Sequence, residues 1–172
     1  MDISVRPAAV DDAPRMAEVH IAAWQHAYNG VVPEDYLAGL DLERLTGVWG
    51  RDLESPTNGV SSLVGEIDGQ IEAIATVGPF RDKATDDDPS GELWMINCHP
   101  GALGTGVSTK LHLSALDRLR SDGHHRAALW VVDQNPRARR FYEREGWTED
   151  SARKEQDFGD QTIVEVRYLI SL

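Results

Sequence analysis

The segment from Gly91 to Trp147 constrains the fold of this 172-residue chain more than any other part. An apolar run, GELWMINCHP, is followed by a glycine-punctuated turn, LGTGVS, and by an amphipathic stretch, TKLHLSALDRLRSDG. A second apolar run, RAALWVV, then leads into DQNPRARRFYEREGW. Short apolar runs bounded by turn residues are typical of buried strands, and the amphipathic stretch is typical of a helix. The segment therefore predicts a strand, a turn, a helix, a second strand and a second helix.

Weaker signals predict the elements that precede this segment. Residues 3–6 have the composition of a short strand, and a helix is expected from about Asp11, with Pro14 in its first turn. A second helical region is expected over residues 34–53, which hold regularly spaced leucines. The chain thus begins with one strand and two helical regions.

Strands are expected on both sides of the central segment. Asp68 and Gly69 form a strong hairpin signal between two apolar, β-branched runs. Two further strands are expected near residues 146–151 and over 162–170. The order of elements indicates an α/β fold on one mixed sheet, and no linker or repeat divides residues 1–172 into more than one domain.

The net charge of −12 is distributed unevenly along the chain. Residues 100–154 hold 10 of the 17 basic and 7 of the 29 acidic residues, which makes this window +3 and leaves −15 outside it. An acidic body argues against nucleic-acid binding, whereas the basic window covers the glycine turn, where a polyanionic cofactor would bind. The alternative is that the surface charge serves only solubility.

Cysteine content and hydropathy indicate where the protein works. The single cysteine, Cys98, cannot form an internal disulfide, which favours a reducing compartment. No apolar stretch is long enough to span a membrane, and the acidic start, MDISVRPAAVDD, is unlike a signal peptide. We therefore predict a cytoplasmic protein without a membrane partner, and we assign no metal site because no histidine has metal-ligand neighbours.

The glycine turn is a candidate anion site. Gly104, Gly106 and the small Ser108 leave the backbone accessible at the start of a helix, where N–H groups point toward a ligand. The N–H groups of Leu103, Thr105 and Val107 are expected to contribute as well. Glycines also make ordinary left-handed turns, so the turn alone is a weak signal.

Taken together, ELWMINCHP, LGTGVS and NPRARRFYEREGW resemble the GNAT superfamily of acyl-CoA-dependent N-acetyltransferases. The resemblance extends over essentially the whole chain. It implies a central mixed, mostly antiparallel sheet of about seven strands with helices on both faces. It also implies acetyl-CoA as the co-substrate.

The resemblance assigns the cofactor contacts by position. The strand over residues 92–98 would diverge from the one over 127–132, and the pantetheine arm would bond to its free backbone groups, as an added strand does. The backbone of Ile96, Asn97 and Cys98 would make these contacts, and Asn135 would contact the cofactor arm. The turn over residues 103–108 would hold the pyrophosphate. It departs from the family pattern at Leu103, where Gln or Arg is usual, and at Ser108, where Gly or Ala is usual.

Two residues are candidates for proton transfer. Tyr142 matches the tyrosine that the family uses to protonate the departing thiolate. A substrate ammonium with a pKa near about 10 must also lose a proton before it attacks. Glu92 is the candidate general base because it begins the strand that presents the thioester, and the alternative is an exposed strand-end carboxylate.

The acceptor pocket is expected under the first two helical regions. The segment IAAWQHAYNGVVPEDYL contains Trp24, Tyr28 and Tyr36, which could hold an amine by cation–π contact or by burying its carbon frame. The alternative is that these rings pack in the core.

The predicted function is transfer of an acetyl group from acetyl-CoA to a primary amine, expected to be on a small molecule, by direct attack. The alternative is a degenerate domain that binds acyl-CoA as a sensor or partner module. A longer acyl donor or a hydroxyl acceptor also stays open, as does the oligomeric state, with a homodimer as one option.

Overall fold

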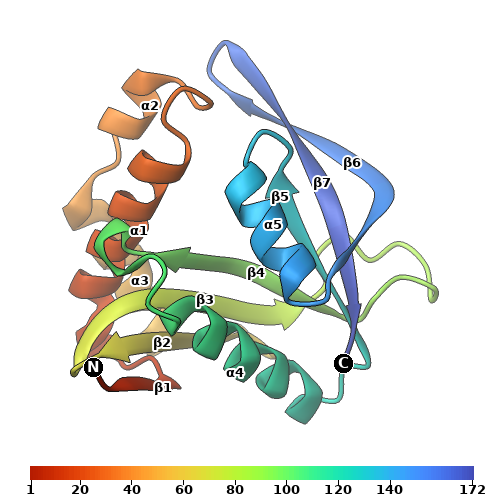
Figure 1. The fold of residues 1–172 in the computed structure, drawn as a ribbon, viewed down its shortest axis with the longest axis horizontal. Coiled ribbons are helices and arrows are strands. Elements are labelled where there is room, and N and C mark those ends of the chain that lie inside the picture. The colour runs from red at the N-terminus through yellow and green to blue at the C-terminus, as the bar shows by residue number, and fades with distance from the viewer.

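A single seven-stranded sheet runs through the computed structural model, which describes residues 1–172 (Figure 1). The strand order is β1-β2-β3-β4-β5-β7-β6. Every neighbouring pair is antiparallel except β4 and β5, which are parallel. The strands span Ile3–Pro7 (β1), Ser61–Ile67 (β2), Gln70–Pro79 (β3), Gly91–Cys98 (β4), Arg126–Val132 (β5), Thr148–Phe158 (β6) and Gln161–Ser171 (β7).

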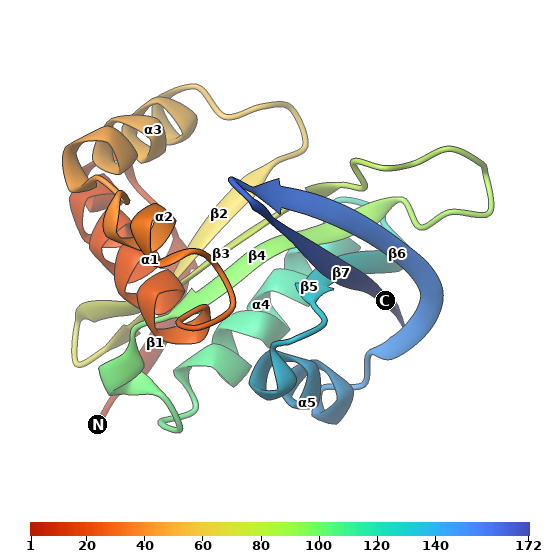
Figure 2. The same ribbon diagram turned by 90° about the horizontal axis from the view of Figure 1, so that it is seen from above.

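Helices cover both faces of the sheet, as Figure 2 shows. One face packs against α1 and α3, and the other packs against α4, with side chains of α5 joining the same core. The predicted fold class is therefore confirmed. No helix combines the length and the apolar character that crossing a membrane requires. The helices span Ala13–Ala27 (α1), Glu34–Ala38 (α2), Leu42–Glu54 (α3), Val107–Ser121 (α4) and Pro136–Arg144 (α5), with short 3-10 turns at Val10–Asp12 and Pro100–Ala102.

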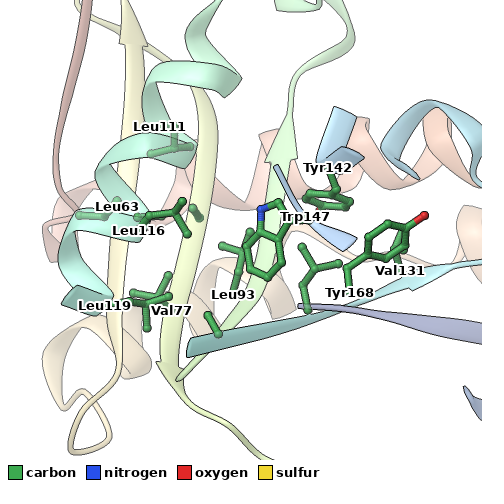
Figure 3. Packing of buried hydrophobic residues seen from close by; sticks show 14 of the residues in the cluster. Leu63, Val77, Leu93, Leu111, Leu116, Leu119, Val131, Tyr142, Trp147 and Tyr168 are labelled. Atoms are coloured by element: carbon green, nitrogen blue, oxygen red, sulfur yellow. The ribbon is translucent and has the colours of Figure 1, made fainter. Parts of the chain in front are cut away.

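Alternation along β3 divides the apolar side chains between two cores. Ala73, Ala75 and Val77 belong to the larger core, whereas Ile74 belongs to the smaller core with α1 and α3. Figure 3 shows the larger core, in which leucines of α4 pack on side chains of β2, β3 and β4. The two cores hold the helices on opposite faces of the strands that form the site.

The second helical region differs from its prediction. The chain forms two helices there, α2 and α3, separated by residues 39–41. The Asp41 carboxylate accepts a hydrogen bond from the Arg44 N–H at 2.6 Å and begins α3 as its N-cap. The helical region predicted over residues 34–53 is therefore two helices, with α3 beginning after Asp41.

The hairpin of β2 and β3 confirms its turn signal. Asp68 has a φ of 50° and Gly69 a φ of 81°, so both turn residues adopt left-handed backbone. Such a pair matches the right-handed twist of the flanking strands. The last hairpin is also present, but β6 extends to Phe158, several residues beyond its predicted end.

Candidate active site

The central feature of the site is a split between the parallel strands β4 and β5. Only two residue pairs, Gly91 with Ala127 and Glu92 with Ala128, join them. Beyond these pairs β4 continues to Cys98 and β5 continues to Val132, but the two strands no longer pair with each other. They diverge in Figure 1. The split leaves backbone groups inside the sheet with no strand partner.

The register of β3 and β4 identifies the backbone groups that face the split. The His99 N–H donates to the Glu72 carbonyl at 2.8 Å, and backbone direction alternates along an antiparallel strand. The groups of Ile96 and Cys98 therefore face the split, whereas those of Asn97 face β3. The backbone contact predicted for Asn97 does not fit this register. The Asn97 side chain instead holds a buried Nδ2 without a hydrogen-bond partner.

A bulge shapes β4 halfway along the split. The register with β3 shifts between Thr76 and Val77, so that Trp94 is the extra residue. The Trp94 Nε1–H donates to the Pro79 carbonyl at 3.0 Å, which fixes the indole. The bulge thus fixes an aromatic ring beside the unpaired stretch of β4.

The glycine turn lies at the amino-terminal end of α4. Gly104 has a φ of 82° and Gly106, the N-cap, a φ of 95°, so left-handed backbone requires glycine at both positions. The N–H groups of Gly104, Gly106 and Ser108 have no protein acceptor. Free N–H groups at a helix start form an anion site.

The other predicted donors of the turn are used within it. The Leu103 N–H bonds to the Pro100 carbonyl at 3.4 Å, and the Thr105 N–H bonds to the Ala102 carbonyl at 3.3 Å. The Val107 N–H lies 3.4 Å from the Thr105 hydroxyl, and the Val107 side chain is fully buried in the larger core. These residues build the turn, and the glycines and Ser108 present the free donors.

Two tyrosines interact, one from each half of the chain. Between them in the sequence, Asn135 caps α5 by accepting a bond from the Ala138 N–H at 3.1 Å. Burial raises the pKa of Tyr28 to about 12, and burial together with the nearby Tyr28 raises the pKa of Tyr142 still further. Both phenols therefore stay protonated at neutral pH and can act as proton donors.

Glu92 lies at the closed end of the split, where its side chain is fully buried. Its carboxylate accepts hydrogen bonds from the Arg81 backbone N–H at 2.9 Å and from the Arg81 Nη2 at 2.5 Å. The catalytic role of Glu92 stays a prediction. This geometry favours an indirect role, in which Glu92 holds Arg81.

A cavity of about 430 Å³ adjoins the split on the side of α1 and β6. Trp24 and Tyr28 line it, whereas Tyr36 is 44% exposed and packs edge-on against the Phe158 ring outside it. Contact of these rings with a substrate stays a prediction. The remaining lining residues come from six other parts of the chain: Val32, Arg81, Trp94, Trp130, Val132, Lys154, Glu155, Gln156, Phe158 and Glu165.

The charged residues of this cavity were not found by sequence reasoning. Lys154 and Glu165 face each other across β6 and β7, with Nζ 3.6 Å from Oε2, and the Lys154 ammonium lies 4.5 Å from the centre of the Trp130 ring. Burial and, to a lesser extent, the negative charge of Glu165 raise the pKa of Tyr28. Only the register of the last hairpin brings these side chains together, and residue spacing along the chain does not show that register.

Residues 20–147 match the sequence model described as the Acetyltransferase (GNAT) family. The chain belongs to this family. Among curated proteins, the GNAT chain is 29% identical over 135 residues to an N-acetyltransferase of Bacillus subtilis, YuaI, covering 78% of this chain and 74% of that one. It is 42% identical over 62 residues to the mycothiol acetyltransferase of Beutenbergia cavernae, but the match covers only 36% of this chain and 21% of that protein.

A solved structure shares the GNAT fold at low sequence identity. The PaiA N-acetyltransferase of Thermoplasma acidophilum, crystallised in complex with coenzyme A, matches with a TM-score of 0.71 at 19% identity. The match covers 96% of this chain and 98% of that one. This likeness supports the arrangement of strands and helices over nearly the whole chain.

The departure at Ser108 leaves the free donors of this GNAT turn intact. The Ser108 N–H has no protein acceptor. On β4, burial raises the pKa of the Cys98 thiol. Cys98 is a half-buried strand residue, and its raised pKa does not favour a nucleophile.

Proposed function

We propose that this GNAT protein transfers the acetyl group of acetyl-CoA to the primary amine of a small molecule. The observation that carries the proposal is the split between β4 and β5, which ends at the glycine turn. Unpaired backbone groups of Ile96 and Cys98 lie along the split, and free N–H groups of the turn lie at its end. A ligand with an amide-bearing arm and a pyrophosphate complements both features.

The reaction proposed is direct attack without a covalent enzyme intermediate. The amine nitrogen forms a bond to the thioester carbonyl carbon, the carbon–sulfur bond breaks, and the sulfur leaves as a thiolate. The amine loses a proton and the thiolate gains one, so that acetylated amine and free coenzyme A result. Tyr142 is the proposed donor to the thiolate because burial keeps its phenol protonated. Tyr28 is a second phenol, and its proximity contributes to the raised pKa of Tyr142.

Glu165 is the carboxylate best placed to receive the amine proton. It lines the acceptor cavity, where its only ion-pair partner is Lys154 of its own hairpin, with Nζ 3.6 Å from Oε2. Glu92 contacts Arg81 on both of its oxygens and does not line the cavity. We therefore assign proton acceptance to Glu165 and the positioning of Arg81 to Glu92.

Two measurements on the same protein test the proposal. Acetyl-CoA is titrated calorimetrically, and release of free thiol is followed with a panel of primary amines. Binding together with amine-dependent thiol release is expected. Binding without release by any amine would support an acyl-CoA sensor instead, and absence of binding would remove the assignment of the split.

A further inference from the structure

A second hollow lies on the other side of Trp94 from the acceptor cavity. It is a groove of about 530 Å³ between α3 and the sheet, on the face that α1 and α3 cover in Figure 2. Its walls are mainly side chains of α3 and of the strands β1, β2 and β3. The proposed function does not use this groove. The apolar members of the wall include Leu45, Val48, Trp49, Leu53, Val60, Leu63 and Met95.

The groove adjoins the acceptor cavity. Arg81 and Trp94 line both hollows, and the Arg81 guanidinium lies 4.6 Å from the centre of the Trp94 ring. Both partners are held: Trp94 by its hydrogen bond to the Pro79 carbonyl, and Arg81 by the buried Glu92. The stacked pair therefore marks the boundary that the two hollows share, and Glu92 holds one half of it.

The two hollows differ in chemistry. The acceptor cavity contains Arg81, Lys154, Glu155 and Glu165, four charged groups that suit a polar, ionisable end of a ligand. The α3 wall of the groove is leucine, valine and tryptophan apart from Asp52, and burial lowers the pKa of His20, which keeps that ring uncharged at neutral pH. A ligand that fills both hollows has a polar head and an apolar tail.

We propose that the acceptor is a primary amine with an alkyl or aryl chain, whose apolar part occupies the α3 groove. The amine group enters the acceptor cavity beside Glu165. The alkyl or aryl chain of the ligand passes the Arg81–Trp94 pair into the groove. This inference rests on the proposed function, since it names the substrate class of the same site. The observation that carries it is that the two hollows adjoin at the pair of residues that lines both.

A series of n-alkylamines from ethylamine to octylamine tests the length of the acceptor. Each methylene buried in the groove should raise kcat/KM by about three- to fourfold until the groove is full. The same series is titrated calorimetrically into the protein loaded with coenzyme A, so that the groove is tested even without turnover. Affinities and kcat/KM values that do not rise with chain length would overturn the inference.

Variants that fill the groove test its location. Val48→Trp, on α3, and Thr57→Trp, in the loop after it, place an indole into the groove. Each should weaken octylamine binding by about tenfold, equivalent to losing nearly two buried methylenes, while ethylamine binding stays unchanged. Leu113→Trp, at a 51% exposed position of α4, is the matched control. If both groove variants and the control bind octylamine equally well, the alkyl chain binds outside the groove.

These outcomes are separable from failure of the proposed function. Absence of thiol release with every amine, despite acetyl-CoA binding, would refute acetyl transfer. A chain-length dependence of binding, abolished by Thr57→Trp, would still support an amphiphilic amine ligand. If Val48→Trp fails to fold, the loop variant and the alkylamine series decide the question.

Discussion

The donor side and the acceptor side of this molecule are built from different atoms. On the donor side, backbone groups of β4 and of the glycine turn face the proposed cofactor, and they come from one continuous stretch of chain. On the acceptor side, the cavity is lined by side chains from α1, the β3–β4 loop, β4, β5, β6 and β7. One side depends on backbone conformation, and the other depends on which side chains the fold brings together.

This difference explains which side can vary. A backbone N–H remains when its residue is replaced, so the donor side tolerates Leu103 and Ser108 as long as the glycine conformations persist. The acceptor side has no such protection, because each change of a lining residue changes the shape or charge of the cavity. Substitutions on the two sides should therefore fail differently.

The largest effect is expected from Gly106→Glu on the donor side. A side chain at a φ of 95° costs about 1–3 kcal/mol, and the carboxylate would repel the pyrophosphate. Together these should raise the dissociation constant of acetyl-CoA by more than about 100-fold, as measured by calorimetry.

Two controls separate backbone strain from charge repulsion. Gly106→Ala adds the strain alone, and the nearest atom to its Cβ is 3.9 Å away, so its effect on affinity should be smaller. Gly123→Glu places the same side chain at a φ of 87° beyond the far end of α4 and should leave affinity unchanged. Normal acetyl-CoA affinity in Gly106→Glu would show that the turn does not hold the cofactor.

Tyr142→Phe should have the next largest effect, at the point where the two sides meet. Loss of the proton donor should lower kcat by about 100-fold and leave the dissociation constant of acetyl-CoA nearly unchanged. Tyr168→Phe is the matched control, because its hydroxyl bonds to Glu143 at 2.8 Å and to Arg139. It should lower the melting temperature without lowering kcat.

The pH profile provides a second readout for the phenols. Raised pKa values keep Tyr28 and Tyr142 protonated well above neutrality, so kcat should not fall with rising pH below about pH 10. An alkaline decline centred near pH 8 would identify a different proton donor.

Replacing each of the two carboxylates, Glu165 and Glu92, by an amide should have a smaller effect and should distinguish their roles. Glu165→Gln should lower kcat/KM at pH 7 by about tenfold, and the loss should shrink as the pH approaches the amine pKa near about 10. Glu92→Gln should instead lower the melting temperature, because it leaves the Arg81 guanidinium without its buried partner. A pH-dependent loss of kcat/KM in Glu92→Gln alone would reverse the two assignments.

The same contrast determines how much could be predicted from sequence. The strand, turn and helix over residues 91–121 were predictable because glycines, apolar runs and helical spacing are local signals. The pairing of Glu92 with Arg81 spans a loop, and the contact of Lys154 with Glu165 needs the register of a hairpin. Neither leaves a periodic pattern. The backbone direction of Asn97 likewise follows from its pairing with β3, which composition does not specify.

The smallest effect is expected from salt. The chain carries −15 outside residues 100–154, whereas the cavity itself is lined by two cations, Arg81 and Lys154, and two anions, Glu155 and Glu165. Attraction of an ammonium compound must therefore come from the wider surface, where salt screens it within about 10 Å at 0.1 M.

Raising the salt concentration should lower kcat/KM for a simple alkylamine by less than about tenfold and leave kcat unchanged, because steering changes encounter and not chemistry. An amine that is uncharged at the assay pH is the matched control and should show no salt response, with acetyl-CoA held saturating so that the basic donor side does not contribute. Equal responses of the charged and uncharged amines would mean that the acidic body does not guide the acceptor, and the selectivity of the acceptor side would then rest on its cavity and groove alone.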